Sequence, residues 1–221
     1  MKKILALLMA LTMLLSFAAC GGEPNVRGEK SNSNTGTTEE TQEELSLGAV
    51  DGLTYENKFI GIGCTLDSTW TFSSDEEMKA LNSAGAELMG EEYVEAMKEA
   101  TVVYDMMATK DNLTDNIQVN LEKMNALQAI ALDVAENYKA VAQAVRESYE
   151  SMGATGFSEE YSKVTIDGKE FDVLNITVDL GGVQMYQTIL SIKCGTYLAN
   201  VIITTAGENT VSSILEGFYL V

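Results

Sequence analysis

The stretch that decides the fold is residues 161–205, YSKVTIDGKEFDVLNITVDLGGVQMYQTILSIKCGTYLANVIITT. β-Branched and aromatic residues dominate it, and three dipeptides interrupt it: Asp167-Gly168, Gly181-Gly182 and Cys194-Gly195. Asp-Gly and Gly-Gly supply the positive φ angles of two-residue hairpin turns, so the four strands should form an antiparallel meander. The expected core faces are Leu174/Ile176/Val178, Tyr186/Thr188/Leu190/Ile192 and Tyr197/Ala199/Val201/Ile203.

The longest helical pattern precedes this meander. Apolar residues recur every three or four positions, which predicts one buried helix face that ends where Gly153 supplies a left-handed cap. The start of the helix stays open, because Asp133 and Glu136 also form a capping-box pair and residues 126–132 could be a separate turn. The expected face is Leu127, Ile130, Val134, Tyr138, Val141, Val145, Tyr149 and Met152.

The N-terminal half of the domain predicts further strands. Ile60, Ile62, Cys64 and Leu66 alternate on one face of a strand, and Tyr55 and Phe59 lie in an earlier arm. Residues 101–108 and 117–121 are rich in strand formers and flank a turn at 111–116, which predicts a hairpin.

Two more helices are expected around these strands. Ser74 and Glu77 form a capping box, so a helix should begin there. After Gly207 a short terminal helix is expected over Val211, Ile214, Leu215 and Phe218. Together these elements predict an α+β fold, a large antiparallel β-sheet covered by helices. The helix that begins at Ser74 should direct inward the side chains of Met78, Leu81, Leu88 and Met89. It should weaken near Gly85 and Gly90 and then resume through Tyr93 and Met97 to Ala100.

The order of elements resembles the Mog1/PsbP-like α/β/α sandwich over most of residues 50–221. The segment YENKFIGIGCTL (55–66), followed by Trp70, is similar to the family's opening pattern Y-x-N … G-I … L-P-x-x-W, with Asp67 in place of the proline. The IDGKEF hairpin (166–171) and the Tyr186-Gln187 strand also fit. The resemblance implies a non-catalytic scaffold that binds proteins, as Mog1-like members engage a small GTPase and PsbP-like members dock on a membrane photosystem. The family also includes small bacterial lipoproteins.

The N-terminus predicts export and lipidation. Lys2 and Lys3 precede an apolar run to Leu15, which is the pattern of a signal peptide over residues 1–19. The following SFAAC resembles the lipobox of bacterial lipoproteins, with Phe17 in place of the usual aliphatic residue, and implies that Cys20 carries fatty acyl chains such as palmitate. The alternative is a plain secretory signal with an accidental cysteine. We therefore expect a lipid anchor on the extracytoplasmic face of the cell membrane.

The next segment predicts a tether for one domain. Residues 20–48 follow the signal with many Gly, Ser, Thr, Asn and Glu and few large apolar side chains, a composition typical of disorder. A flexible coil of this length has a root-mean-square reach of about 30 Å. Residues 49–221 are long enough for a single domain with its own core.

Charge and residue types exclude several functions. The chain has 14 Lys plus Arg against 33 Asp plus Glu, a net charge of −19, which disfavours nucleic acid and anionic lipid headgroups as partners. It contains no histidine, which excludes Ser-His and Cys-His nucleophile pairs and His-ligated metals. No nucleotide-binding or hydrolase motif is present. We expect no enzyme activity, no catalytic residue, no cofactor and no metal site.

A few residues leave alternatives open. Cys64 and Cys194 lie on expected core faces, which favours two buried thiols over a disulfide. The Asp-rich turn at 111–116 lacks the calcium-loop pattern, and Gly61-Ile-Gly63 indicates a closely approached strand. Trp70 is expected as a core or lid aromatic, with a ligand-stacking platform as the alternative. The methionines are expected in the core, with an adaptable binding groove as the alternative.

Two functional hypotheses follow. The first is a protein-interaction module that binds an envelope or surface protein, and it predicts an exposed apolar or Met/Tyr-lined patch and no enclosed pocket. The alternative is a receptor for a small ligand such as a peptide, sugar or cation, and it predicts a concave pocket with a few convergent polar groups. The sequence identifies no ligand-binding residue.

Overall fold

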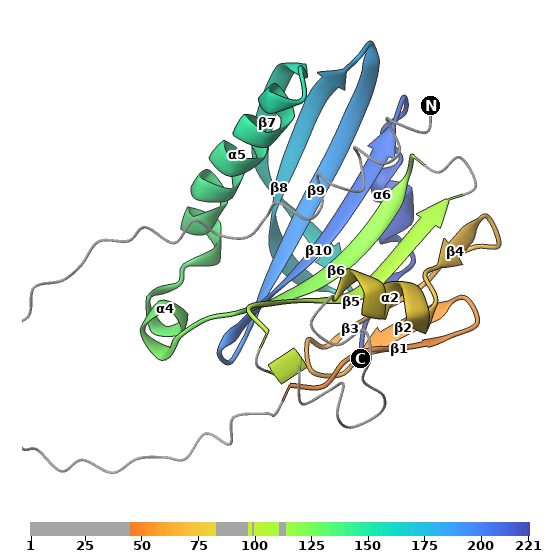
Figure 1. Ribbon diagram of the computed structural model, residues 1–221, viewed down its shortest axis with the longest axis vertical. Helices are drawn as coiled ribbons and strands as arrows, with labels where there is room; N and C mark the ends of the chain where they lie inside the picture. Colours follow the sequence, from red (N-terminus) through yellow and green to blue (C-terminus); the bar gives the residue numbers. More distant parts are fainter. Residues whose placement is uncertain (1–44, 83–96, 99, 111–113) are drawn as a thin grey trace, which may run out of the picture.

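Two antiparallel sheets form the frame of the protein in a computed structural model that describes residues 45–82, 97–98, 100–110 and 114–221 (Figure 1). Within these residues the large sheet has the strand order β4-β5-β6-β10-β9-β8-β7, and the small sheet has the order β1-β2-β3-β11. The large sheet contains β4 (Trp70–Phe72), β5 (Val102–Lys110), β6 (Asn116–Lys123), β7 (Thr155–Ile166), β8 (Lys169–Leu180), β9 (Val183–Cys194) and β10 (Tyr197–Ala206). The small sheet contains β1 (Ala49–Asp51), β2 (Thr54–Asn57), β3 (Ile62–Thr65) and β11 (Phe218–Leu220). The helices are α2 (Asp75–Leu81), α4 (Ala126–Ala131), α5 (Val134–Ser151) and α6 (Val211–Leu215).

The C-terminal meander is confirmed. Strands β7 to β10 pair in sequence, and the first turn has positive φ at Asp167 (47°) and Gly168 (79°), as an Asp-Gly hairpin requires. The third turn lies one residue later than expected, because Cys194 still pairs with Tyr197 and Gly195-Thr196 makes the loop. Strand β7 also begins earlier than expected, at Thr155.

The central strands of the large sheet are buried on both faces, and the face toward α5 includes buried polar side chains such as Asn200 and Thr204. Every residue of β10 from Tyr197 to Thr205 is buried. Val201 and Ile203 pack into a core shared with the small sheet, whereas Ile202 packs into a second core beneath α5. Because alternate residues of a strand point to opposite faces, a strand that is buried at both parities has a covering layer on each side.

The two covers differ in kind, which refines the expected architecture. The α+β class and the large antiparallel sheet are confirmed, and α5 packs on one face over β7, β8 and β9. Residues 54–66, however, fold into a separate sheet that covers the other face together with α6. The physical reason is that β3 pairs on its free side with the C-terminal β11, through Cys64 opposite Phe218. Of the expected core faces, Leu174/Ile176/Val178 pack beneath α5, whereas Leu190, Ile192 and Tyr197/Ala199/Val201/Ile203 pack toward the small sheet.

The long helix begins later than its apolar pattern suggests. Helix α5 starts at Val134, where the Asp133 carboxylate accepts a hydrogen bond from the backbone N–H of Glu136 (3.1 Å). The preceding residues form the separate helix α4, and the extended backbone of Leu132 breaks the helical phase between the two. The expected burial of Leu127 and Ile130 is therefore wrong, since these side chains are 78% and 80% exposed. The cap at Gly153 is confirmed by its φ of 81°.

Helix α2 is confirmed with both bonds of its capping box, between Ser74 and Glu77. Met78 and Leu81 are half-buried, and Met97 is fully buried. The expected positions of Leu88, Met89 and Tyr93 lie outside the described residues, as do the signal peptide, Cys20 and most of the tether. The expected tether extends too far, because Leu45 is buried in the core and the domain thus begins before residue 49. No helix within the described ranges combines the length and apolarity needed to cross a membrane.

Tyr138 of α5 reaches into the large sheet where β8 and β9 separate. Its hydroxyl donates to the carbonyl of Asp172 in β8 (2.9 Å) and accepts from the N–H of Ser191 in β9 (2.8 Å). The paired register of the two strands ends at the neighbouring pair, Val173 opposite Leu190. The hydroxyl therefore satisfies two backbone groups that the strands no longer satisfy themselves.

The two buried tyrosines of α5 make a matched test of this role. Tyr138→Phe should lower the free energy of unfolding by about 1–3 kcal/mol, because it removes the partner of the buried N–H of Ser191 and of the partly buried carbonyl of Asp172. Tyr149 is equally buried, but its hydroxyl has no hydrogen-bond partner among the described residues. Tyr149→Phe should therefore be neutral or stabilising. Urea denaturation of both variants measures the difference, and equal losses would contradict the assigned role of Tyr138.

Candidate functional site

A β-bulge in β5 places one carboxylate out of the regular sheet. Tyr104 pairs with Asn120 and Met106 pairs with Val119, so Asp105 is an extra residue without a partner of its own in β6. Bulges of this kind redirect a side chain away from the normal alternation of the strand, and they occur often beside functional sites. Here the bulge turns Asp105 toward the N-terminal segment that leads into the small sheet.

The carboxylate of Asp105 joins this segment to the large sheet. Oδ1 accepts from the backbone N–H of Gly48 (2.9 Å). Oδ2 accepts from the same N–H (3.1 Å), from the Tyr55 hydroxyl (2.5 Å) and from Asn57 Nδ2 (2.7 Å). Tyr55 and Asn57 are both fully buried, so the bonds lie at the interface of the two sheets. Asn57 also caps the β2–β3 turn, because its Oδ1 accepts from the N–H groups of Phe59 and Ile60.

Gly48 is required by the close approach of these groups. A Cβ atom at this position would lie 2.3 Å from Cε2 of Tyr55 and 2.9 Å from Oδ2 of Asp105. Only a residue without a side chain lets the backbone pass near enough for its N–H to reach the carboxylate.

Burial controls the protonation of this cluster. It raises the pKa of the Asp105 carboxyl above its ordinary range, and the hydrogen bonds from Tyr55, Asn57 and Gly48 offset part of this effect. Burial and the neighbouring Asp105 also raise the pKa of Tyr55, whose hydroxyl stays protonated and keeps donating. The pKa of Asp105 is shifted in the opposite direction to the lowered pKa values of Asp67 and Glu77, and groups with perturbed pKa values are often found at functional sites.

Asp105 lies on the wall of a cleft of about 420 Å³, which we name the Asp105 cleft. Its lining residues come from helix α2, from the chain between Leu47 and Val50, and from β5. Asn82, at the end of α2, holds the helix to the bulge, because its side chain exchanges two hydrogen bonds with the backbone of Tyr104 (2.7 and 2.8 Å). The lining side chains include Met78, Lys79, Asp75, Tyr104, Met106 and Met107.

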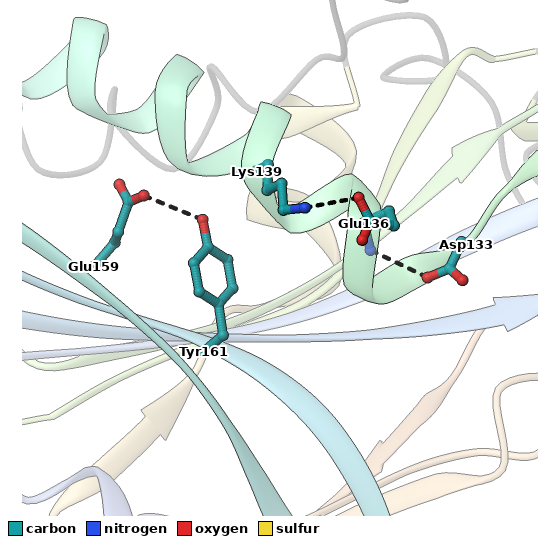
Figure 2. A network of polar contacts seen from close by, with 5 residues as sticks. All are labelled: Asp133, Glu136, Lys139, Glu159 and Tyr161. Atoms are coloured by element: carbon teal, nitrogen blue, oxygen red, sulfur yellow. Dashed lines mark hydrogen bonds and ion pairs between the residues drawn. The ribbon is translucent and has the colours of Figure 1, made fainter.

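The charged surface of α5 contrasts with this cleft. Figure 2 shows Lys139 paired with Glu136 (2.8 Å) on the helix, while the Tyr161 hydroxyl donates to Glu159 (3.1 Å) on β7. Lys139 and Glu136 are well exposed, so solvent screens their attraction and the pair contributes little. These contacts have the character of a solvated surface and form no enclosed site.

The other candidates from the sequence are structural. Cys64 is buried and Cys194 is half-buried, and the two thiols are not joined, as the preferred interpretation held. Burial raises the pKa of Cys64 to about 12, which makes the thiol unreactive. Trp70 is buried in the core beneath the ammonium group of Lys110. Gly63 meets the ring of Tyr219, which confirms a closely approached strand. No group of three or more Cys, Asp or Glu in the described ranges is arranged to hold a metal.

Sequence reasoning missed Asp105, because one acid among 33 carries no signal by itself. A partial signal existed in the quoted Tyr55-x-Asn57 pattern, since both polar side chains of that pattern donate to Asp105. A pair of polar residues on an otherwise buried strand implies a polar partner. Only the pairing of β5 identifies that partner as the bulged residue of β5.

Comparison with known proteins gives no family. No protein-family model matches the chain, and no curated protein matches it. The matching solved structures include a crystal structure from Bacteroides thetaiotaomicron VPI-5482, which is 11% identical over 78% of this chain, with a TM-score of 0.40. The chain spans about half the length of that protein, of which 49% is covered.

The raised pKa of Asp105 predicts a pH dependence of stability. The folded state holds this proton more tightly than the unfolded state, so the stability that Asp105 contributes is fully present below its ordinary pKa of 3.8. That contribution is lost as the pH rises through the raised pKa. The free energy of unfolding of the wild type, minus that of Asp105→Asn, should therefore fall as the pH rises from about 3.8. Urea denaturation across this range measures the difference.

Asp67 supplies a control of opposite sign. Hydrogen bonds from Thr69 lower the pKa of this exposed carboxyl, so its contribution is present above its ordinary pKa and is lost as the pH falls. The corresponding difference for Asp67→Asn should rise with pH. A difference for Asp105→Asn that stays constant or rises would contradict the assigned burial.

Proposed function

We propose that this chain is a lipoprotein of the extracytoplasmic face of the cell membrane, anchored through acyl chains on Cys20. The support is the sequence of residues 1–20, in which two lysines, an apolar run and small residues precede a single cysteine. The polar segment that follows would tether the domain near the membrane surface and leave its orientation free.

We further propose that the domain is a non-catalytic binding module that uses the Asp105 cleft. The observation that carries this proposal is the bulged Asp105, which lines an open cleft and is held by neutral donors. The absence of histidine from the sequence fits binding better than nucleophilic chemistry. The segment that resembles Mog1/PsbP-like domains supports the same proposal. Its residues Tyr55 and Asn57 both donate hydrogen bonds to Asp105.

The bound partner in the leading form of the proposal is an envelope or surface protein. Val50, on the rim of the cleft, is 47% exposed, and such an apolar side chain beside a cleft is suited to contact with a protein. The second candidate is a receptor for a small ligand. The volume of the cleft favours it, since about 420 Å³ lies within the range of about 300–1,000 Å³ typical of ligand pockets.

Lipid attachment is tested by metabolic labelling with an alkyne analogue of palmitate. The wild type should carry label and sediment with membranes, whereas Cys20→Ser should lose the label and appear in the supernatant. Cys194→Ser is the matched control and should keep its label, because Cys194 belongs to β9 of the folded domain. Label on Cys20→Ser, or an unlabelled wild type, would contradict the anchor.

Binding at the cleft is tested by a photocrosslinking amino acid placed at Val50 in the producing cells. A protein partner should give one discrete adduct that is weakened by Asp105→Asn. The same group at Glu160, exposed on β7, should give no such adduct. A small-ligand receptor gives no adduct, but its thermal midpoint should rise with a ligand, by mass action on the folded state. If neither a crosslinked adduct nor a rise in the thermal midpoint is observed, the binding function of the cleft is contradicted.

A further inference from the structure

Neutral groups supply all the hydrogen bonds that the described residues make to the carboxylate of Asp105. Its bonds come from the backbone of Gly48, the hydroxyl of Tyr55 and the amide of Asn57, all neutral. Among the residues that the structure describes, no lysine or arginine pairs with it, although Lys79 lines the same cleft. A partly buried charge without an opposite charge is costly, and a bound cation would offset that cost.

The two carboxylate oxygens of Asp105 differ in how many further hydrogen bonds each can accept. Among the described residues, Oδ2 accepts from Tyr55 and Asn57 and also shares the Gly48 N–H with Oδ1, which accepts no other bond. A carboxylate has about four lone-pair sites, two on each oxygen, so Oδ1 can accept at least one more donor. Because Asp105 lines the cleft, a ligand that enters the cleft has access to this carboxylate.

The remaining walls suit an aliphatic stem behind the charged head. Met78, Met106 and Met107 line the cleft together with Leu47 and Val50. Methionine side chains are flexible and adapt to alkyl groups of different shape. Asp75, at the start of α2, adds a second carboxylate to the lining. At long range the net charge of −19 attracts cations toward the whole domain.

We propose that the Asp105 cleft binds a primary alkylammonium group, with the ammonium at Oδ1 of Asp105 and the alkyl stem along the methionines. This inference rests on the proposed binding function of the cleft. The ammonium belongs either to a small amine or to a lysine side chain of a protein partner, and both present the same chemistry to the site.

Two other cations fit this site less well. The guanidinium of arginine prefers to bond both oxygens of a carboxylate at once, and here Oδ2 is already filled. Metal ions such as calcium need six or more oxygen ligands, and no cluster of acids suited to a metal lies within the described ranges. A lysine-type ammonium is a compact charge that a single oxygen can accept.

The test is an NMR titration of the full chain labelled with ¹³C at the methionine methyl groups. The probes are n-butylammonium chloride and n-butanol, which share size and alkyl stem but differ in charge. The ammonium should shift the methyl resonance of Met78, identified through Met78→Leu, with a dissociation constant about tenfold or more below that of butanol. Met152, at the end of α5, is the control methyl and should not shift.

Two variants assign the effect to Asp105. Asp105→Asn should remove the preference for the ammonium probe, whereas Glu160→Gln, which changes the net charge equally on exposed β7, should keep it. If Asp105→Asn fails to fold, the comparison of the two probes on the wild type decides alone. Equal binding of both probes, or no shift of Met78 with either, would overturn the inference. The proposed binding function is decided separately, by the crosslink from Val50 and the thermal shift.

The source of the ammonium is distinguished with peptides. Gly-Lys-Gly is compared with Gly-norleucine-Gly, which keeps the stem and lacks the charge. If the site takes a lysine of a partner protein, Gly-Lys-Gly should bind more tightly than n-butylammonium, and Gly-norleucine-Gly should not. If it takes a free amine, the flanking peptide should weaken binding. In both cases, tighter binding of the charged probe than of its uncharged counterpart supports the inference. Equal binding within both pairs, n-butylammonium with n-butanol and Gly-Lys-Gly with Gly-norleucine-Gly, contradicts it.

Discussion

The central strands of the large sheet are buried on both faces, and this constraint explains the layers that pack on them. A strand such as β10, buried along almost its whole length, cannot leave either face to water. Helix α5 covers one face, and the small sheet with α6 covers the other. The second cover is assembled from the two ends of the domain, because β11 pairs with β3 at its edge. Closure of that face therefore depends on segments far apart in the sequence.

Asp105 adds a polar contact to this otherwise apolar interface. Apolar packing alone is not directional, whereas a carboxylate with three neutral donors fixes the position of the segment that carries Gly48, Tyr55 and Asn57. The cost is a charge in a partly buried position, visible as the raised pKa of Asp105. The same carboxylate lines the cleft beside α2. A structural contact and a binding surface thus share one residue, and this combination makes the cleft the leading candidate for function.

Local sequence patterns correctly predicted a hairpin turn and two helix ends, because neighbouring residues determine these features. Asp167-Gly168 gave the turn, Ser74 with Glu77 gave the helix start, and Gly153 gave the helix end, because each acts within a few residues. The exposure of Leu127 and Ile130 was missed, since a helical period continues across a break that only the backbone of Leu132 reveals. The second sheet and the Asp105 cleft were missed because they arise from contacts between residues about 50 or more positions apart. No local pattern encodes such pairings.

Asp105 holds the N-terminal segment of the domain against the large sheet. Amide hydrogen exchange at Gly48 in the wild-type chain tests it most directly. Gly48 precedes the first strand, so its backbone lies outside the regular pairing of β1 with β2, and the bond from its N–H to Asp105 is what should protect it. We predict exchange as slow as that of Cys64 in β3. Exchange at the rate of an unstructured peptide would show that the segment is not held, and would contradict the account.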